Sequence, residues 1–126
     1  MRVVTTVITG LVLLVGLSLG VYKYVHDSSQ SMVGQLEQVE TMIQNAKWDG
    51  AKVQLEQTKI SWDQTKYWWT ILLDHQELDN IDIGMSRLQR YVDTQGLSLA
   101  LGELSALKML VDHISDKEAF NLRNIL

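Results

Sequence analysis

Residues 3–22, VVTTVITGLVLLVGLSLGVY, form a run of twenty residues without a charge. At a rise of ~1.5 Å per residue, a helix of this length spans about 30 Å, the thickness of a bilayer's hydrocarbon core. The part of the chain that follows is too small to surround so long an apolar helix in its core. The stretch therefore predicts a membrane anchor (residues 1–26) followed by a domain outside the lipid (residues 27–126).

A cleaved signal peptide is the alternative interpretation, because Ser18 and Gly20 give a small-x-small pattern that a signal peptidase accepts. The apolar part of a signal peptide is usually only about 7–15 residues long, so an uncleaved anchor is preferred. Arg2 precedes the apolar run and Lys23 follows it, and the positive-inside bias slightly favours a cytoplasmic N-terminus. We therefore expect a single-pass protein of the cell membrane with an extracytoplasmic domain.

The domain is acidic. From Asp27 onward, nine Lys or Arg stand against fifteen Asp or Glu. A domain of this charge without a basic patch argues against nucleic acid and against docking on anionic lipid. The chain has no proline, which favours long helices over strands. It has no cysteine either, which excludes lipoprotein attachment and disulfides.

Apolar residues at steps of three and four predict four helices after the anchor. The first, over about residues 28–46, has the expected core residues Met32, Leu36, Val39, Ile43 and Ala46. The second ends near residues 74–75 and has Trp48, Ala51, Leu55, Thr58, Trp62, Trp69 and Leu73. The third has Leu78, Ile81, Met85, Leu88 and Val92, and the fourth has Leu97, Ala100, Leu104, Val111 and Ile114. The first helix either begins at a cap formed by Asp27 and the following serines or simply continues the membrane helix.

Local signals give the expected boundaries. Residues 48–50 (WDG) and 94–96 (TQG) predict the turns inside two helical hairpins, and Asp79 or Asn80 is expected to cap the third helix. Residues 115–118 read SDKE, a capping box that predicts a separate short C-terminal helix containing Leu122, Ile125 and Leu126.

A weak internal repeat accompanies the hairpins. Trp48, Ala51 and Leu55 have the same spacing as Leu97, Ala100 and Leu104, each group next to a glycine-containing turn. The offset of 49 residues is too long for tetratricopeptide repeats, whose period is about 34. Short turns make neighbouring helices antiparallel, so the predicted fold is all-α: an N-terminal transmembrane helix, then an antiparallel four-helix bundle with a short C-terminal helix.

Three segments resemble a known family: residues 66–69 (KYWW), 73–81 (LDHQELDNI) and 97–104 (LSLALGEL). They are similar to the domain-of-unknown-function family numbered 4363, over the whole chain, with DHQELDNI as the most specific part. The family comprises small proteins of spore-forming Gram-positive bacteria with one N-terminal membrane helix. The resemblance implies an architecture and a group of hosts, and it implies no activity.

Two Asp-His pairs are the candidate metal ligands: Asp74-His75 and Asp112-His113. Carboxylates and imidazoles close together bind divalent ions, and in an up-and-down bundle both pairs would lie at one end. Helix capping and the helix dipole explain the same residues more simply, so we expect no metal and no cofactor. The sequence lacks HExxH, CxxC, paired ExxH and phosphate-loop motifs, and it shows no recognisable nucleophile with a base, so we expect no enzyme.

The second helix has apolar residues on two faces. Val53, Ile60, Tyr67 and Ile71 fall opposite its core stripe, and Trp68 points away from that stripe as well. Leu99, Ala106 and Leu110 do likewise on the fourth helix. A helix that is apolar on two faces is central in its fold or forms part of an interface, so a protein partner or a second copy is expected here. Trp68 is expected at the lipid interface or against the outer end of the anchor, and a groove between helices is the alternative.

The function expected from the sequence is that of a membrane-tethered binding or scaffolding module. The anchor would raise the effective concentration of an apolar helical surface near other membrane proteins. The alternative is an extracytoplasmic domain that senses a small ligand or a metal through the Asp-His end of the bundle.

Overall fold

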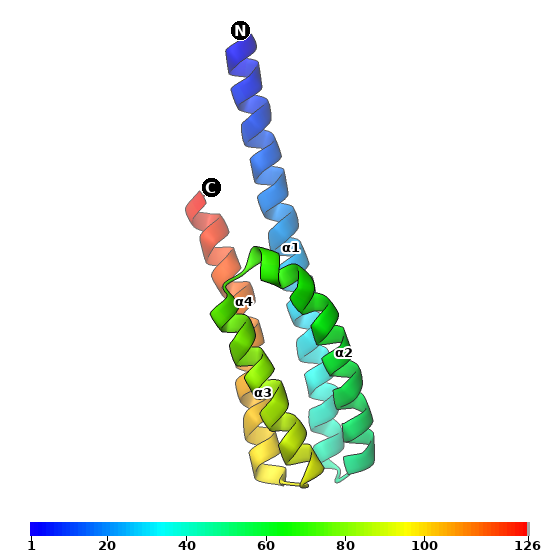
Figure 1. Cartoon of the computed structure of the whole chain (residues 1–126). Coiled ribbons are helices and arrows are strands. Elements are labelled where there is room, and N and C mark those ends of the chain that lie inside the picture. The colour runs from blue at the N-terminus through cyan, green and yellow to red at the C-terminus, as the bar shows by residue number, and fades with distance from the viewer. Residues whose placement is uncertain (126) are drawn as a thin grey trace.

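The computed structural model describes residues 1–125, except for the side chains of residues 120–122 and 125. It confirms the all-α class, and no strand occurs among residues 1–125 (Figure 1). Over these 125 residues the chain forms four helices: α1 (Arg2–Gln44), α2 (Trp48–Leu72), α3 (His75–Asp93) and α4 (Leu97–Ile125). The direction of the chain reverses at each of the three connections (Figure 1).

One unbroken helix, α1, contains both the apolar run and the first helix of the bundle. Its 43 residues correspond to a length of about 65 Å. Within the described part of the chain it is the one helix long and apolar enough to cross a membrane, and none of its apolar window is buried. Burial begins at Val25. Of the two arrangements that the sequence allowed, the structure therefore has the continuous helix.

The serines after Asp27 do not cap a new helix, because their hydroxyls bond back to α1 itself. Ser28 Oγ donates to the carbonyl of Tyr24 at 2.7 Å, and Ser29 Oγ donates to the carbonyl of His26 at 2.9 Å. A serine can make such back-bonds within a continuing helix, so these residues do not interrupt α1.

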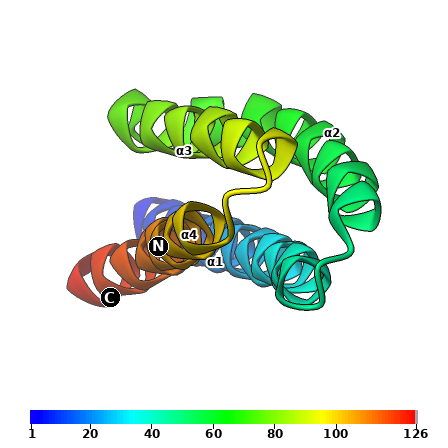
Figure 2. The ribbon, with the colours of Figure 1, turned by 90° about the horizontal axis from the view of Figure 1, so that it is seen from below.

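The four helices form two layers around one core. Figure 2 shows α1 and α4 in one layer and α2 and α3 in the other. Each helix packs against two others, so that α1 contacts α2 and α4, and α3 contacts the same two. An ion pair between Lys108 Nζ and Glu40 Oε2 at 2.9 Å joins α4 to α1.

The core agrees with most of the predicted positions. All five residues predicted on α3 are buried, as are four on each of α1 and α4 and five on α2. Ala46 and Leu97 are exposed, contrary to prediction, because Ala46 lies in a turn and Leu97 is the first residue of α4. Trp48 and Leu73 are only partly buried. Five further buried residues were not predicted: Val25, Ser29, Gly84, Leu107 and Ser115.

The first predicted turn is displaced by three residues. The turn comprises residues 45–47, whereas Trp48 and Gly50 lie in the first turn of α2. Ala46 adopts φ 55°, in the left-handed region. The Ala46 amide donates to Ile43 (3.0 Å) and the Lys47 amide to Met42 (2.8 Å), which is the hydrogen-bond pattern of a Schellman motif.

The predicted turn at residues 94–96 is confirmed, and it repeats the geometry of the first. Gln95 adopts φ 55°, as Ala46 does. Its amide donates to Val92 at 3.1 Å, and the Gly96 amide donates to Tyr91 at 2.8 Å. The two turns lie 49 residues apart, which is the offset of the weak sequence repeat.

The repeat extends through both hairpins. Nine buried positions of α1 and α2 have a buried counterpart 49 residues later in α3 and α4. The pairs are Ser29/Leu78, Met32/Ile81, Leu36/Met85, Val39/Leu88, Ile43/Val92, Ala51/Ala100, Leu55/Leu104, Thr58/Leu107 and Trp62/Val111. The domain is therefore built from two helical hairpins in the same register.

The predicted short C-terminal helix is wrong, because α4 continues through residues 115–118 without a break. Ser115 does not cap a helix. It is buried on the core face, and its Oγ lies 2.9 Å from Nδ1 of His26 in α1. The hydroxyl is thus engaged with a neighbouring helix. The side chains of Leu122, Ile125 and Leu126, predicted for the short helix, lie outside the described residues.

A polar contact joins α2 to α3. Asp82 of α3 accepts a hydrogen bond from the indole N–H of Trp62 at 2.7 Å and forms an ion pair with Lys66 of α2. The hydrogen bond to Asp82 raises the pKa of Lys66, against the lowering effect of partial burial. This pair of helices packs less extensively than α1 and α4 do, so the polar contact is a substantial part of its interface.

The left-handed residues of the two turns give a test of their geometry. A residue other than glycine costs about 1–2 kcal/mol in this conformation, and the extra freedom of glycine in the unfolded chain offsets part of the gain from replacing it. We expect Ala46→Gly to stabilise the full chain by about 0.5–1 kcal/mol. Unfolding of the chain in detergent micelles, followed by circular dichroism, measures the change.

Ala106→Gly is the matched control, since Ala106 is exposed within α4. There glycine should destabilise by about 1 kcal/mol. Equal destabilisation by the two substitutions would contradict the left-handed turn at Ala46.

Candidate interaction site

The outer face of α2 carries an exposed apolar row, which we call the outer row: Val53, Ile60, Tyr67 and Ile71. Each of the first three precedes a buried core residue by two positions, namely Leu55, Trp62 and Trp69. Two positions on a helix correspond to about 200°, so the outer row points away from the core. Its members are 60%, 54%, 67% and 68% exposed. These residues therefore lie opposite the core stripe, as their helical spacing predicted.

The outer row ends in an aromatic pair at the C-terminal end of α2. Trp68 is 56% exposed, and its ring meets that of Tyr67 edge to face, with centroids 5.4 Å apart. Trp62 and Trp69 differ from Trp68 in both burial and bonding. They are buried, and their indole N–H groups donate to Asp82 and to Ser28.

Trp68 also lines a groove between α2 and α1, which we call the junction groove. Its volume is about 360 Å³, and it is lined by Gly16, Leu17, Gly20, Val21 and Tyr24 of α1 with Trp68 and Leu72 of α2. No atom outside the local helix lies within 4 Å of where a Cβ would stand on Gly16 or Gly20. The two glycines therefore leave a shallow strip on α1 beside the Trp68 ring.

The same end of the bundle is fastened to α1 by two side-chain hydrogen bonds. The indole of Trp69 donates to Ser28 Oγ at 3.0 Å, and Nδ1 of His26 lies 2.9 Å from Ser115 Oγ of α4. The Tyr22 ring stacks on His26 with centroids 5.8 Å apart. The point at which the apolar run enters the bundle is thus held by both α2 and α4.

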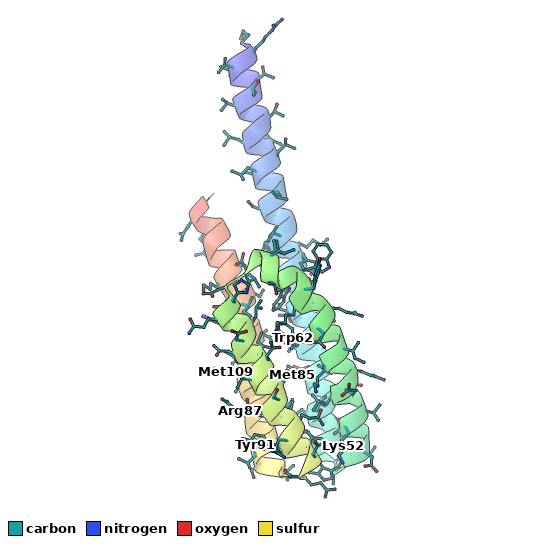
Figure 3. All side chains as sticks on the ribbon, in the orientation of Figure 1. Lys52, Trp62, Met85, Arg87, Tyr91 and Met109 are labelled. Atoms are coloured by element: carbon teal, nitrogen blue, oxygen red, sulfur yellow. The ribbon has the colours of Figure 1, made fainter. Side chains whose placement is uncertain are left out.

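Beyond this junction, the N-terminal turns of α1 have no other helix beside them. Their side chains extend from the helix on all sides (Figure 3). Apart from Val15, which is half-buried, the large apolar residues of this region are 47–75% exposed from Val3 to Leu19. This apolar surface continues directly into the junction groove at Gly16 and Leu17.

The structure does not bring the candidate metal ligands together. Oδ1 of Asp74 accepts from the amide of Gln76 at 3.0 Å and so caps α3, a role predicted for Asp79 or Asn80. Asp112 instead accepts from Nε2 of Gln30 at 3.3 Å, and both His75 and His113 are exposed. Among residues 1–125 with described side chains, no three His, Asp or Glu residues are grouped closely enough to hold a metal ion.

A second apolar surface lies on α4. Leu99 and Ala106 are exposed as predicted, whereas Leu110 is only partly buried and packs against the core. Met109, which the sequence reasoning missed, is 73% exposed. The signal was available, because Met109 precedes buried Val111 by two positions, as Ile60 precedes Trp62.

Acidic and basic groups of α3 and α4 meet near the start of α3. Lys117 Nζ pairs with Glu77 Oε1 at 3.0 Å. Burial, followed by the nearby negative charge of Glu77, raises the pKa of Glu118 above its ordinary value of 4.5, while Lys117 acts in the opposite direction. Folding therefore makes Glu118 easier to protonate than it is in the unfolded chain.

This shift predicts a pH-dependent effect on stability. The pKa of Glu118 is higher in the folded chain than in the unfolded chain. The protonated side chain therefore contributes to the free energy of unfolding in full below pH 4.5, and this contribution is lost as the pH rises through the pKa of the folded chain. Glu118→Gln should therefore stabilise the chain at neutral pH, and the difference from the parent chain should shrink toward pH 4.5. Unfolding curves of the two chains across this range measure the effect, and parallel pH profiles would contradict it.

No curated protein and no solved structure matches the chain. One family does match it: the family described as Domain of unknown function (DUF4363) matches residues 19–125. The matched region includes the junction of the apolar run with the bundle and both helical hairpins. The chain therefore belongs to this family of unknown function, as the resemblance of its sequence predicted.

Proposed function

We propose that the chain is a membrane-anchored helical binding module without catalytic activity of its own. The apolar run of α1 spans the cell membrane once as an uncleaved anchor. The antiparallel bundle lies outside the cytoplasm, and the outer row of α2 docks another membrane-associated protein. The observation that supports this best is the exposure of the outer row, since the outward face of a packed helix is normally polar.

The energetics of the outer row favour a docking role. Burying one large apolar side chain contributes about 1.5–3 kcal/mol. Val53, Ile60 and Tyr67 recur every seven residues, so they form one straight ridge of the kind that packs against a partner helix. Asp49, Glu56 and Asp63 recur at the same interval along one flank. Lys52, Lys59 and Lys66 recur at this interval too, so a partner with an apolar stripe bordered by charges of both signs would complement this face.

Because the chain is anchored, a small binding surface is sufficient to hold a partner. A binding surface held at the membrane meets other membrane proteins at a raised effective concentration. A site of low affinity is therefore occupied for a larger fraction of the time. The continuous α1 adds a geometric restriction, because the outer row keeps a fixed direction relative to the apolar run. The proposed module therefore presents its surface in a defined orientation and at a defined height.

Site-specific photocrosslinking in native membranes tests this proposal. A benzophenone amino acid replaces Ile60 in the outer row, and the control carries it at Ser86, an exposed position of α3. We expect an adduct of defined mass from position 60, lost when Tyr67→Lys places a charge in the row, and none from position 86.

The mass of the adduct identifies the occupant. Twice the mass of the chain indicates self-association, and any other defined mass indicates a different protein. Equal labelling at positions 60 and 86 would overturn the docking role. The intact mass of the purified chain tests the anchor, since a chain beginning at Val21 would show that the apolar run is cleaved.

A further inference from the structure

We infer that the junction groove binds an acyl chain of a membrane phospholipid, so that lipid is wedged between the end of α2 and the anchor. This inference rests on the proposed membrane anchor. It adds a second contact with the bilayer, made by the folded domain and not by the apolar run alone.

The depth of the groove places it where acyl chains are present. If residues 3–22 cross the hydrocarbon core, Gly16 lies about 9 Å and Gly20 about 3 Å inside the boundary marked by Tyr22. Tyr24 lies about 3 Å beyond it, at the level of the headgroups. The groove therefore begins within the hydrocarbon and ends among the headgroups.

The shape of the groove suits a flexible chain that runs along α1. Gly16 and Gly20 are one helical turn apart and leave an open strip parallel to the helix axis. Trp68 and Leu72 form a wall on the other side. The volume of about 360 Å³ falls within the range of small-molecule pockets, roughly 300–1,000 Å³. An acyl chain aligned with the bilayer normal would lie in this strip.

The polar groups at the rim favour a phospholipid over a purely apolar occupant. Unlike Trp62 and Trp69, whose indoles donate to Asp82 and Ser28, Trp68 donates to no protein atom in the described part of the chain. Its N–H is free for the ester and phosphate oxygens that lie at this depth, where indole and phenol rings are favoured. Lys23, also exposed, follows at the same level.

Continuity of the apolar surface identifies the bilayer as the source of the occupant. The exposed side chains of α1 from Val3 to Leu19 lead without a break into the groove. Lipid that covers the anchor already surrounds the mouth of the groove, so no additional partner is needed to fill it.

A photoactivatable phospholipid tests the inference. The full chain is reconstituted in phosphatidylcholine nanodiscs that contain a phosphatidylcholine with a diazirine on its acyl chain, and labelled peptides are mapped by mass spectrometry. We expect labelling both of the apolar run and of residues 68–72. The second label is required by the inference, because an acyl chain in the groove lies against Trp68 and Leu72 of α2.

Two matched glycine substitutions distinguish labelling through the groove from labelling by general exposure to lipid. Gly20→Leu fills the groove, whereas Gly10→Leu adds the same side chain to α1 outside it, and neither site has an atom within 4 Å of the new Cβ. We expect Gly20→Leu to abolish labelling of residues 68–72 and Gly10→Leu to preserve it. Circular dichroism checks that both variants remain helical.

Failure of the inference and failure of the anchor give different results. Labelling confined to residues 3–22 would contradict acyl-chain binding in the groove but would agree with the membrane anchor. Labelling of residues 68–72 that persists in Gly20→Leu would also contradict acyl-chain binding in the groove, because the label would then come from lipid that contacts the surface of α2. Absence of label from residues 3–22 would overturn the anchor itself.

Discussion

The structure depends on α1 remaining helical from the apolar run into the bundle. Nothing at Lys23 to Ser29 interrupts it: the serine hydroxyls bond back to the helix, and Val25 already enters the core. The hydrogen bonds from Trp69 to Ser28 and between His26 and Ser115 then tie α2 and α4 to this same segment. No flexible linker separates the apolar run from the bundle, so a movement of the apolar run would be transmitted directly to the bundle.

The two hairpins share one register but present different surfaces. Nine core positions repeat after 49 residues, and the two inner turns have equivalent hydrogen bonds and a left-handed residue at the equivalent position, Ala46 or Gln95. Outside the core the repeat lapses, because Tyr67 and Trp68 of α2 correspond to Asp116 and Lys117 of α4. The aromatic end is therefore confined to the hairpin that contains the apolar run, which places it beside the junction.

Much of the core followed from helical periodicity, which is strongest where one face alone is buried. All five predicted residues of α3 are buried for this reason. Local signals were less reliable. Gly50 suggested a turn that Ala46 makes instead, and the SDKE segment suggested a helix start although Ser115 bonds to His26. That bond joins residues 89 positions apart, and the junction groove likewise combines Gly16 with Trp68, so neither was visible in a local pattern.

Continuity of α1 across the junction is the central claim, and a distance between two spin labels tests it most directly. The chain has no native cysteine, so Val12→Cys and Gln38→Cys place one label in the apolar run and one in the bundle. Both positions are exposed, and 26 residues of unbroken helix separate them by about 39 Å. In nanodiscs, pulsed electron paramagnetic resonance should show one narrow distribution near that distance, allowing for the label linkers. A broad distribution, or one centred well below it, would reveal a hinge at the junction and contradict the account.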